Sequence, residues 1–177
     1  ININVEDVAI GMGLDSRIGS RFLRAGPSYG GSCFPKDTKA IVSTADKFKI
    51  DLTLIKKVIL SNSNRSKLLL KKISRILSNK FNNKKICFLG VTFKANTDDM
   101  RESSCLSMIP FLSNKGSFIT YFDPTGEKKE LRKIKNVKFS NSIKLACYKS
   151  DLIIIHTEWN EFKSLNFKKL VNKKNFT

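Results

Sequence analysis

The sequence has few of the residues that build metal centres and disulfide frameworks. It contains one histidine and four cysteines, at positions 33, 87, 105 and 147. No two cysteines have the CxxC spacing of zinc or redox sites, so we expect no metal site. Cys87, Cys105 and Cys147 fall in apolar strand or helix patterns, which predicts buried, unreactive thiols. Such cysteine usage is typical of a reducing, cytoplasmic compartment.

Long apolar runs are also missing. No run of about 18 or more apolar residues occurs, so we predict no membrane span. The first residues, ININVEDVAIGMG, include acidic side chains and lack the basic region of a secretory signal. A GxGxxG dinucleotide fingerprint is absent, because GMG at 11–13 has no third glycine and follows no predicted strand.

Acidic residues are scarce: 15 Asp and Glu stand against 33 Lys and Arg, which gives a net charge of +18. Such a charge can indicate nucleic-acid binding. Lysine outnumbers arginine several-fold, however, and is spread along a chain that is also rich in asparagine. We therefore expect no nucleic-acid partner, although part of the charge could steer an anionic ligand such as a nucleotide.

Hydrophobic periodicity predicts an α/β fold class. Helices are expected over 5–13, 34–48, 51–80, 99–115 and 141–150, and strands over 85–91, 117–123, 137–140 and 151–157. Polar SNSNRS, residues 61–66, predicts a kink or a solvent-exposed stretch in the long helix. Strands that alternate with helices indicate a doubly wound parallel sheet, where ligands bind beyond the carboxyl ends of the strands. "GVTFKANTDDMRES" follows the first of these strands.

The segment GPSYGGSCFPKD, residues 26–37, places one cysteine between a glycine loop and a predicted helix. Gly30 and Gly31 would let backbone and substrate approach closely. Pro35 suits the first turn of a helix. Cys33 then lies at the helix N-terminus, which stabilises an anion by about 0.3–1 kcal/mol and favours the reactive thiolate.

Charged residues follow the cysteine at once. Lys36 and Lys39 would stabilise a thiolate further, and Asp37 could hold a water or a proton near the sulfur. Asp37 could instead simply cap backbone N–H groups, and the glycines could form an ordinary turn. The single histidine, His156, ends an apolar strand, so we expect a structural role for it and no thiol–histidine protease.

Several motifs together resemble the UDP-glucose 6-dehydrogenase family, one of the UDP-glucose/GDP-mannose dehydrogenases. GMGLDSRIGSRFLRAGPSYGGSCFPKDTKAI is similar to that family's active-site segment, and ICFLGVTFKANTDDMRESS, YFDP and TEWNEF resemble its C-terminal domain in the same order. The resemblance covers essentially the whole chain. YGGSCFPKD favours the glucose branch over enzymes of N-acetylated hexosamine nucleotides, which tend to carry a GGHC-type segment; a GDP-mannose dehydrogenase is the nearer alternative.

The resemblance implies oxidation of a nucleotide-sugar alcohol to a carboxylate in two steps with two NAD molecules. Cys33 would attack the intermediate aldehyde to give a thiohemiacetal and then a thioester, which water hydrolyses. Asp37 matches an aspartate that assists this chemistry. NAD contacts are implied for Lys36 and Arg101.

The resemblance also implies the residues that bind the UDP-sugar. They are Arg17, the loop Arg24, Ala25, Gly26, Pro27, Ser28, Tyr29 and Gly30, and Phe93 and Lys94 at the nucleotide end. Read from the residues alone, Phe93 could belong to the core, and Lys94 and Arg101 could be solvated charges. DMRE, residues 99–102, also has the pattern of a helix start with Asp99 as the cap.

By this resemblance the chain would comprise three parts: a piece of a central helical domain (1–50), a connecting helix (51–82) and a UDP-sugar-binding Rossmann-like domain (83–177). The family's N-terminal NAD-binding domain, its catalytic lysine, asparagine and glutamate, and its last strand are not matched. We therefore expect a truncated sheet, a homodimer built through the central helix, and no oxidation by this chain alone. A non-catalytic UDP-sugar-binding or dimerisation module is the alternative.

Overall fold

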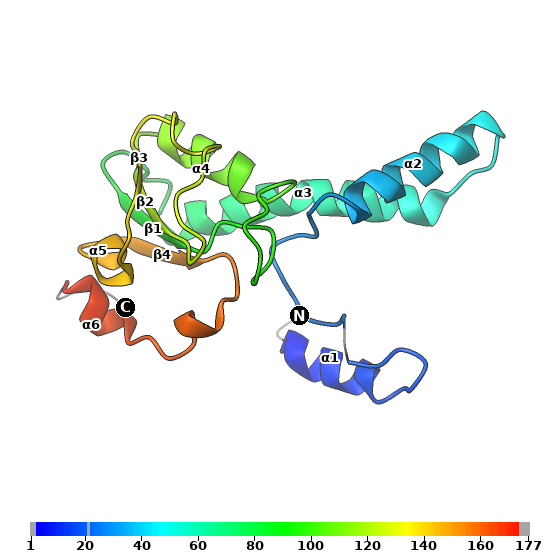
Figure 1. Cartoon of the computed structure of the whole chain (residues 1–177), viewed down its shortest axis with the longest axis horizontal. Helices are drawn as coiled ribbons and strands as arrows, with labels where there is room; N and C mark the ends of the chain where they lie inside the picture. The colour runs from blue at the N-terminus through cyan, green and yellow to red at the C-terminus, as the bar shows by residue number, and fades with distance from the viewer. Residues whose placement is uncertain (1–2, 21, 174–177) are drawn as a thin grey trace.

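The structure is a computed structural model that describes residues 3–20 and 22–173. A helical half and a sheet half lie side by side (Figure 1). The helices are α1 (Val5–Gly13), α2 (Phe34–Lys47), α3 (Thr53–Ile76), α4 (Cys105–Asn114), α5 (Ile143–Cys147) and α6 (Phe167–Val171), with a 3-10 helix η1 (Asn160–Phe162). The strands are β1 (Lys85–Leu89), β2 (Phe118–Phe122), β3 (Val137–Phe139) and β4 (Leu152–Ile155).

The four strands form one parallel sheet in the order β3-β2-β1-β4. Successive side chains of a strand point to opposite faces. Accordingly Ile86 and Phe88 of β1 pack with α3 and α4, whereas Cys87 and Leu89 pack with α5 and η1. Because helices cover both faces, the predicted doubly wound α/β sheet is confirmed.

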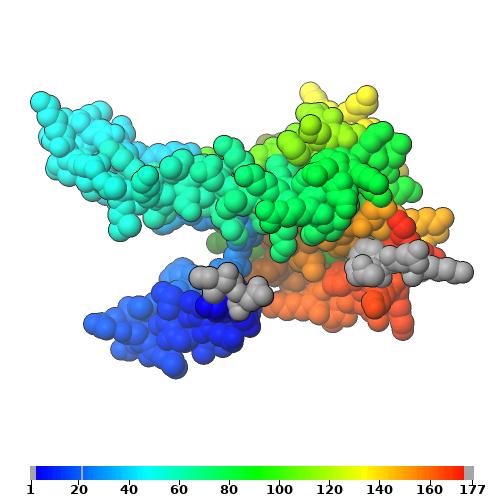
Figure 2. All heavy atoms as spheres, turned by 180° about the vertical axis from the view of Figure 1, so that it is seen from behind, coloured from blue at the N-terminus to red at the C-terminus, as the bar shows by residue number. Residues whose placement is uncertain are grey.

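The helices α2 and α3 form an arm that projects from the sheet half (Figures 1 and 2). The C-terminal end of α3 is fixed to the sheet, since Ile73 joins the core beneath α4. The other end of the arm exposes apolar side chains among charged ones, with Phe48 and Leu54 more than 70% accessible. Helix α1, in which no residue is buried, lies as a separate lobe beneath the arm (Figure 2).

Two predicted elements differ from the structure. The fourth helix begins at Cys105 and not near Asp99, because the Asp99 carboxylate accepts the Arg101 N–H at 2.8 Å and Glu102 has φ +55°. Residues 99–104 are therefore a turn and not a first helical turn. Of the two alternatives predicted for residues 61–66, the kink is absent, since α3 runs unbroken for 24 residues. The solvent-exposed stretch agrees with the structure, because none of these six residues is buried.

Among the described residues, no helix is both long and apolar enough to cross a membrane.

Candidate functional site

Three stretches that are distant in sequence meet beside the carboxyl ends of β1 and β4. They are residues 24–33, the loop 90–104 after β1, and the middle of α3, joined by hydrogen bonds that span 33 to 70 residues. Parallel sheets place ligands at this edge. The meeting point therefore defines the candidate site.

Cys33 lies at this meeting point with its thiol exposed. It occupies the residue immediately before α2, as predicted, with the Ser32 hydroxyl 3.6 Å from its sulfur. The Asp37 N–H donates to the Cys33 carbonyl at 2.8 Å, while the Asp37 carboxylate lies 3.5 Å from the Lys36 ammonium. The structure thus joins Asp37 to Cys33 through the backbone, with both charged side chains facing solvent.

The two glycines before Cys33 seat this segment on Phe93. A Cβ at Gly31 would lie 2.8 Å from the Phe93 ring, and Gly31 has φ +83°. A Cβ at Gly30 would lie 2.9 Å from both Phe93 and the Glu102 carbonyl. Neither position has room for a side chain, so Gly-Gly is required for close packing of the cysteine segment on the loop after β1.

That loop is also held to the cysteine segment by polar contacts. The Gly31 N–H donates to the Arg101 carbonyl at 2.8 Å, and Lys39 of α2 pairs with Glu102 at 3.1 Å. The Arg101 guanidinium bonds the Asp99 carboxylate, which raises the pKa of Arg101 and lowers that of Asp99; the nearby Cys33 contributes less. Arg101 therefore presents a positive charge near the thiol, although its side chain is already paired with Asp99.

The polar stretch of α3 holds the substrate loop expected at residues 24–30. Asn62 accepts the Tyr29 N–H at 2.9 Å and donates to the Tyr29 carbonyl at 3.0 Å. Arg65, one turn later, donates to the carbonyls of Pro27 and Gly26 at 3.1 and 3.3 Å. Tyr29 in turn stacks edge-on against Phe34, the first residue of α2. We call Asn62 and Arg65 the clamp, because they hold this loop. Sequence reasoning missed both residues; the available signal was two polar side chains three positions apart on one helix face.

Replacing Asn62 by alanine is expected to free the loop. Two net hydrogen bonds are lost, which corresponds to about 1–2 kcal/mol. The Tyr29 amide should then exchange with deuterated solvent about 5–30 times faster, measured by amide hydrogen exchange. Ser63→Ala is the matched control, because that hydroxyl bonds only to the Leu60 carbonyl of its own helix. Equal exchange in both variants would contradict the clamp.

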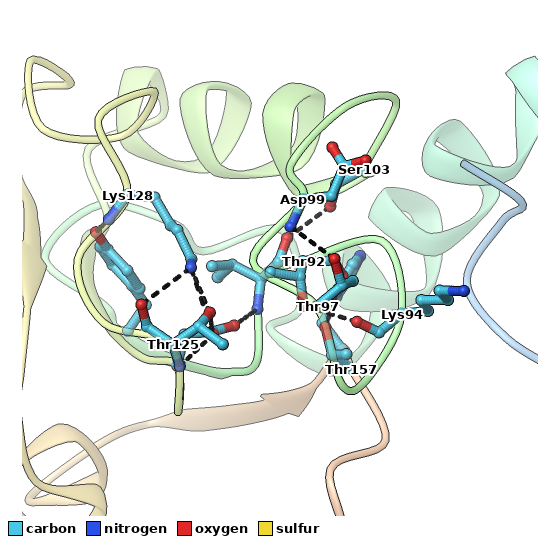
Figure 3. A network of polar contacts seen from close by, with 12 residues as sticks. Thr92, Lys94, Thr97, Asp99, Ser103, Thr125, Lys128 and Thr157 are labelled. Atoms are coloured by element: carbon cyan, nitrogen blue, oxygen red, sulfur yellow. Dashed lines mark hydrogen bonds and ion pairs between the residues drawn. The ribbon is translucent and has the colours of Figure 1, made fainter. Parts of the chain in front are cut away.

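A polar network connects the loop after β1 to the residues that follow β2 and β4 (Figure 3). The Asp123 carboxylate, at the end of β2, accepts the Val91 N–H at 2.9 Å. The Thr157 hydroxyl, after β4, donates to the Thr92 carbonyl at 2.7 Å, and the Thr92 hydroxyl donates to the Lys94 carbonyl at 2.9 Å. Three neighbouring strands thus hold the loop that carries Phe93 and Lys94.

His156 belongs to the same support and not to the exposed site. Its side chain is buried, with Nε2 2.7 Å from the Ser104 hydroxyl and Nδ1 3.2 Å from that of Thr157. Burial lowers the pKa of His156 to about 4. The predicted structural role fits this position.

The three other cysteines are buried. Burial raises the pKa of Cys105 well above its usual value, and the Cys147 thiol together with burial raises that of Cys87. Cys33 therefore differs from them in being the exposed thiol among the described residues.

The remaining predicted site residues make fewer contacts with the Cys33 segment and with the loop after β1. Lys94 is exposed, with its ammonium 5.4 Å from the Phe93 ring centroid. Arg24 lies 3.9 Å from Glu158, beyond β4, so it borders the same edge. Ala25 is exposed and Ser28 is half-buried in the clamped loop. Arg17 follows α1, bonds to Asp15 at 2.6 Å, and is not brought to Cys33 by any contact of the described residues.

Two domain descriptions of one protein family match nearly the whole chain. Residues 1–64 match the central domain of the UDP-glucose/GDP-mannose dehydrogenase family, and residues 87–177 match its UDP binding domain. The chain belongs to this family. The cysteine segment and the loop after β1 thus lie in the two different matched regions and meet in the structure.

Relatives with names in this family share much of the sequence. The UDP-glucose 6-dehydrogenase of Rhizobium meliloti is 41% identical over 170 residues, and that of Rickettsia prowazekii 43% over 175 residues; the matches cover 96% and 97% of this chain. A UDP-glucose dehydrogenase structure from Pyrobaculum islandicum matches with a TM-score of 0.82 and 28% identity over 90% of the chain. The chain spans about two fifths of these relatives: 39% and 40% of the two sequences and 37% of the structure.

Proposed function

We propose that this chain forms the nucleophile and UDP-sugar-binding part of a UDP-glucose 6-dehydrogenase. The observation that carries the proposal is the exposed Cys33 thiol at the start of α2, packed through Gly30 and Gly31 against the Phe93 loop. This contact supports the proposal because it brings the Cys33 thiol to the carboxyl ends of the strands, where parallel sheets bind ligands.

The proposed chemistry centres on the sulfur. The Cys33 thiolate adds to the aldehyde carbon of the oxidised sugar; a C–S bond forms, and the aldehyde oxygen takes a proton to give a thiohemiacetal. Loss of a hydride from that carbon, which NAD would accept, together with loss of the hydroxyl proton leaves a thioester. Water then adds to the thioester carbon, the C–S bond breaks, and the sulfur recovers a proton as the carboxylate leaves. Asp37, one helical turn after Cys33, would hold the water or accept its proton.

The substrate would lie along the clamped loop. Residues Arg24 to Gly30 would follow the nucleotide-sugar, Phe93 and Lys94 would meet the nucleotide end, and Arg17 would complete the site. An ammonium such as that of Lys94 suits a phosphate oxygen. Asn62 and Arg65 would act by holding the loop in one conformation, so that less ordering is needed on binding.

NAD is the cofactor that this function requires, as hydride acceptor in both oxidations. Lys36 and Arg101 border Cys33 and are the proposed contacts. The described residues do not fit a complete NAD site, however. A Cβ at Gly90, directly after β1, would lie 2.5 Å from the Thr157 side chain, so this glycine serves close packing, and no glycine-rich strand-to-helix turn follows it to cradle a pyrophosphate. We therefore expect this chain alone to bind sugar nucleotide without oxidising it.

The proposed organisation keeps the three parts 1–50, 51–82 and 83–177, with a homodimer formed through the arm. The exposed apolar side chains along the arm, among them Ile41, Leu54 and Val58, would be covered by the second copy. A different nucleotide sugar, GDP-mannose or UDP-N-acetylmannosamine, is the alternative substrate, and a non-catalytic binding module is the alternative function.

A chimera tests the proposal. This chain would replace the matching segment of the Rhizobium meliloti enzyme, and NADH formation would be followed with UDP-glucose, UDP-N-acetylmannosamine and GDP-mannose. We expect NADH with UDP-glucose above the other two, and no UDP-glucuronate from the Cys33→Ser chimera. Lys72→Ala, an exposed position near the C-terminal end of α3 and outside the candidate site, should retain activity.

A second measurement keeps the test decisive if the chimera is inactive because its parts fit poorly. In the native chain, iodoacetamide near neutral pH should alkylate Cys33 much faster than the three buried cysteines, as measured by peptide mass spectrometry. Calorimetry with UDP should detect binding. Equal alkylation of all four thiols, or a Cys33→Ser chimera with full activity, would overturn the nucleophile. UDP binding with no turnover in a folded chimera would support the non-catalytic module.

A further inference from the structure

A basic groove with an apolar floor lies at the amino ends of the strands, opposite the carboxyl ends where Cys33 is found. Its volume is about 1150 Å³, and its walls come from the C-terminal half of α3, the segment before β1 and the end of α4. Residues 79–82 precede β1, and Lys115 precedes β2, so the groove lies at the amino ends of these strands. It is therefore distinct from the candidate site and does not depend on the proposed function.

The floor of the groove is preformed. Leu70 and Phe81 pack against the main core, and Phe81 meets Phe111 edge-on with centroids 6.3 Å apart. The Phe81 carbonyl accepts a hydrogen bond from the buried Ser117 hydroxyl at 2.8 Å. A fixed apolar floor lowers the ordering cost of binding.

The charge of the groove has one sign. Lys67, Lys71, Lys80 and Lys115 line it, and no acidic side chain does. None of the four ammonium groups has a carboxylate partner among the residues that the structure describes, whereas Lys56, elsewhere on α3, has two. Four unneutralised cations around an apolar floor are complementary to an anionic, amphipathic partner.

The shape and the aromatic geometry select among anionic partners. The volume lies near the upper end of the roughly 300–1,000 Å³ of small-molecule pockets, which gives room for a peptide segment. A concave floor does not match a flat lipid surface. Single-stranded nucleic acid needs open ring faces for stacking, whereas the Lys115 ammonium lies over the Phe111 ring, 5.8 Å from its centroid. We propose that this groove binds an acidic amphipathic peptide segment of a partner protein, with apolar side chains on the floor and carboxylates on the lysines.

Fluorescence polarisation tests the proposal with the whole chain. The probe is a labelled helical peptide with Leu and Phe on one face and Glu on the flanks; a second peptide has Lys in place of Glu, and a third ligand is a single-stranded oligonucleotide. We expect the acidic peptide to bind, and the Lys71→Glu/Lys115→Glu double variant to weaken it at least about tenfold. Phe111→Ser should weaken it as well.

The matched control is Lys57→Glu, which reverses an exposed α3 charge outside the groove and should change the affinity less than about twofold. Circular dichroism would confirm that each variant is folded. Equal binding of the acidic and basic peptides would overturn the proposal. So would equal weakening by Lys57→Glu, which indicates diffuse charge attraction, or tighter, groove-dependent binding of the oligonucleotide.

Discussion

Replacing Lys128 by methionine is expected to lower the free energy of unfolding by about 3–5 kcal/mol. The side chains of Lys128 and Asp123 are 5% and 0% exposed, with Nζ 3.6 Å from Oδ1. Methionine keeps most of the volume but removes the cation, which leaves the Asp123 carboxylate buried without an opposite charge. The measurement is urea-induced unfolding, followed by the fluorescence of the single tryptophan, Trp159.

The loss should fall toward the lower end of that range, because Asp123 keeps other partners. Its carboxylate still accepts hydrogen bonds from the Val91 N–H and from the N–H and hydroxyl of Thr125. Lys129→Met, at the exposed neighbouring position, is the matched control and should change stability by less than about 0.5 kcal/mol. The neutral pair Asp123→Asn/Lys128→Met should lose less than Lys128→Met alone. Equal stability of the Lys128 and Lys129 variants would contradict the buried ion pair.

This pair also connects stability to the site. Asp123 holds the Val91 N–H at the start of the loop that carries Phe93, and Phe93 supports Gly31 beside Cys33. A change at the end of β2 is therefore connected to the cysteine segment by the Asp123–Val91 hydrogen bond and by the packing of Phe93 on Gly31. The YFDP motif, residues 121–124, thus supports the loop that carries Phe93.

Local patterns in the sequence predicted most of the elements. The strands lie within the predicted ranges because β-branched and aromatic residues in short runs pack well on both faces of a covered sheet. Helix α2 begins where Cys33 and Pro35 indicated. The fourth helix was predicted about six residues too early, because Asp99 and Glu102 matched a capping pattern, whereas in the structure Asp99 bonds to the Arg101 N–H and side chain.

The contacts that build the site were not predictable in the same way. Asn62 and Tyr29 are 33 residues apart, and a single polar residue in a helix does not specify a partner at that distance. The need for two glycines likewise depends on the Phe93 ring, which arrives from another part of the fold. Sequence alone therefore indicated Cys33 as the candidate nucleophile, while the side chains that hold its loop became visible only from tertiary contacts.

Stability is expected to fall by about 3 kcal/mol as the pH decreases from about 6.5 to about 4, through His156 alone. Well above pH 6.5 the imidazole is neutral in both the folded and the unfolded chain. Between the two values the unfolded chain binds a proton with the ordinary pKa of 6.5, whereas burial holds the folded pKa at about 4. Because the unfolded state binds more protons in this window, acid favours unfolding, at up to about 1.4 kcal/mol per pH unit.

His156→Gln isolates this contribution, since glutamine can still hydrogen-bond the Ser104 hydroxyl but cannot titrate. The substitution also changes a buried contact, so the quantity to compare is the slope of the unfolding free energy with pH between about 4 and 6.5 and not its absolute value. Carboxylates titrate in both proteins and cancel in the difference. The wild-type slope should be steeper, with the difference vanishing above about pH 7, where neither state protonates His156. Identical slopes would show that the imidazole takes up its proton without unfolding, and that the Ser104–His156–Thr157 contact does not depend on a neutral ring.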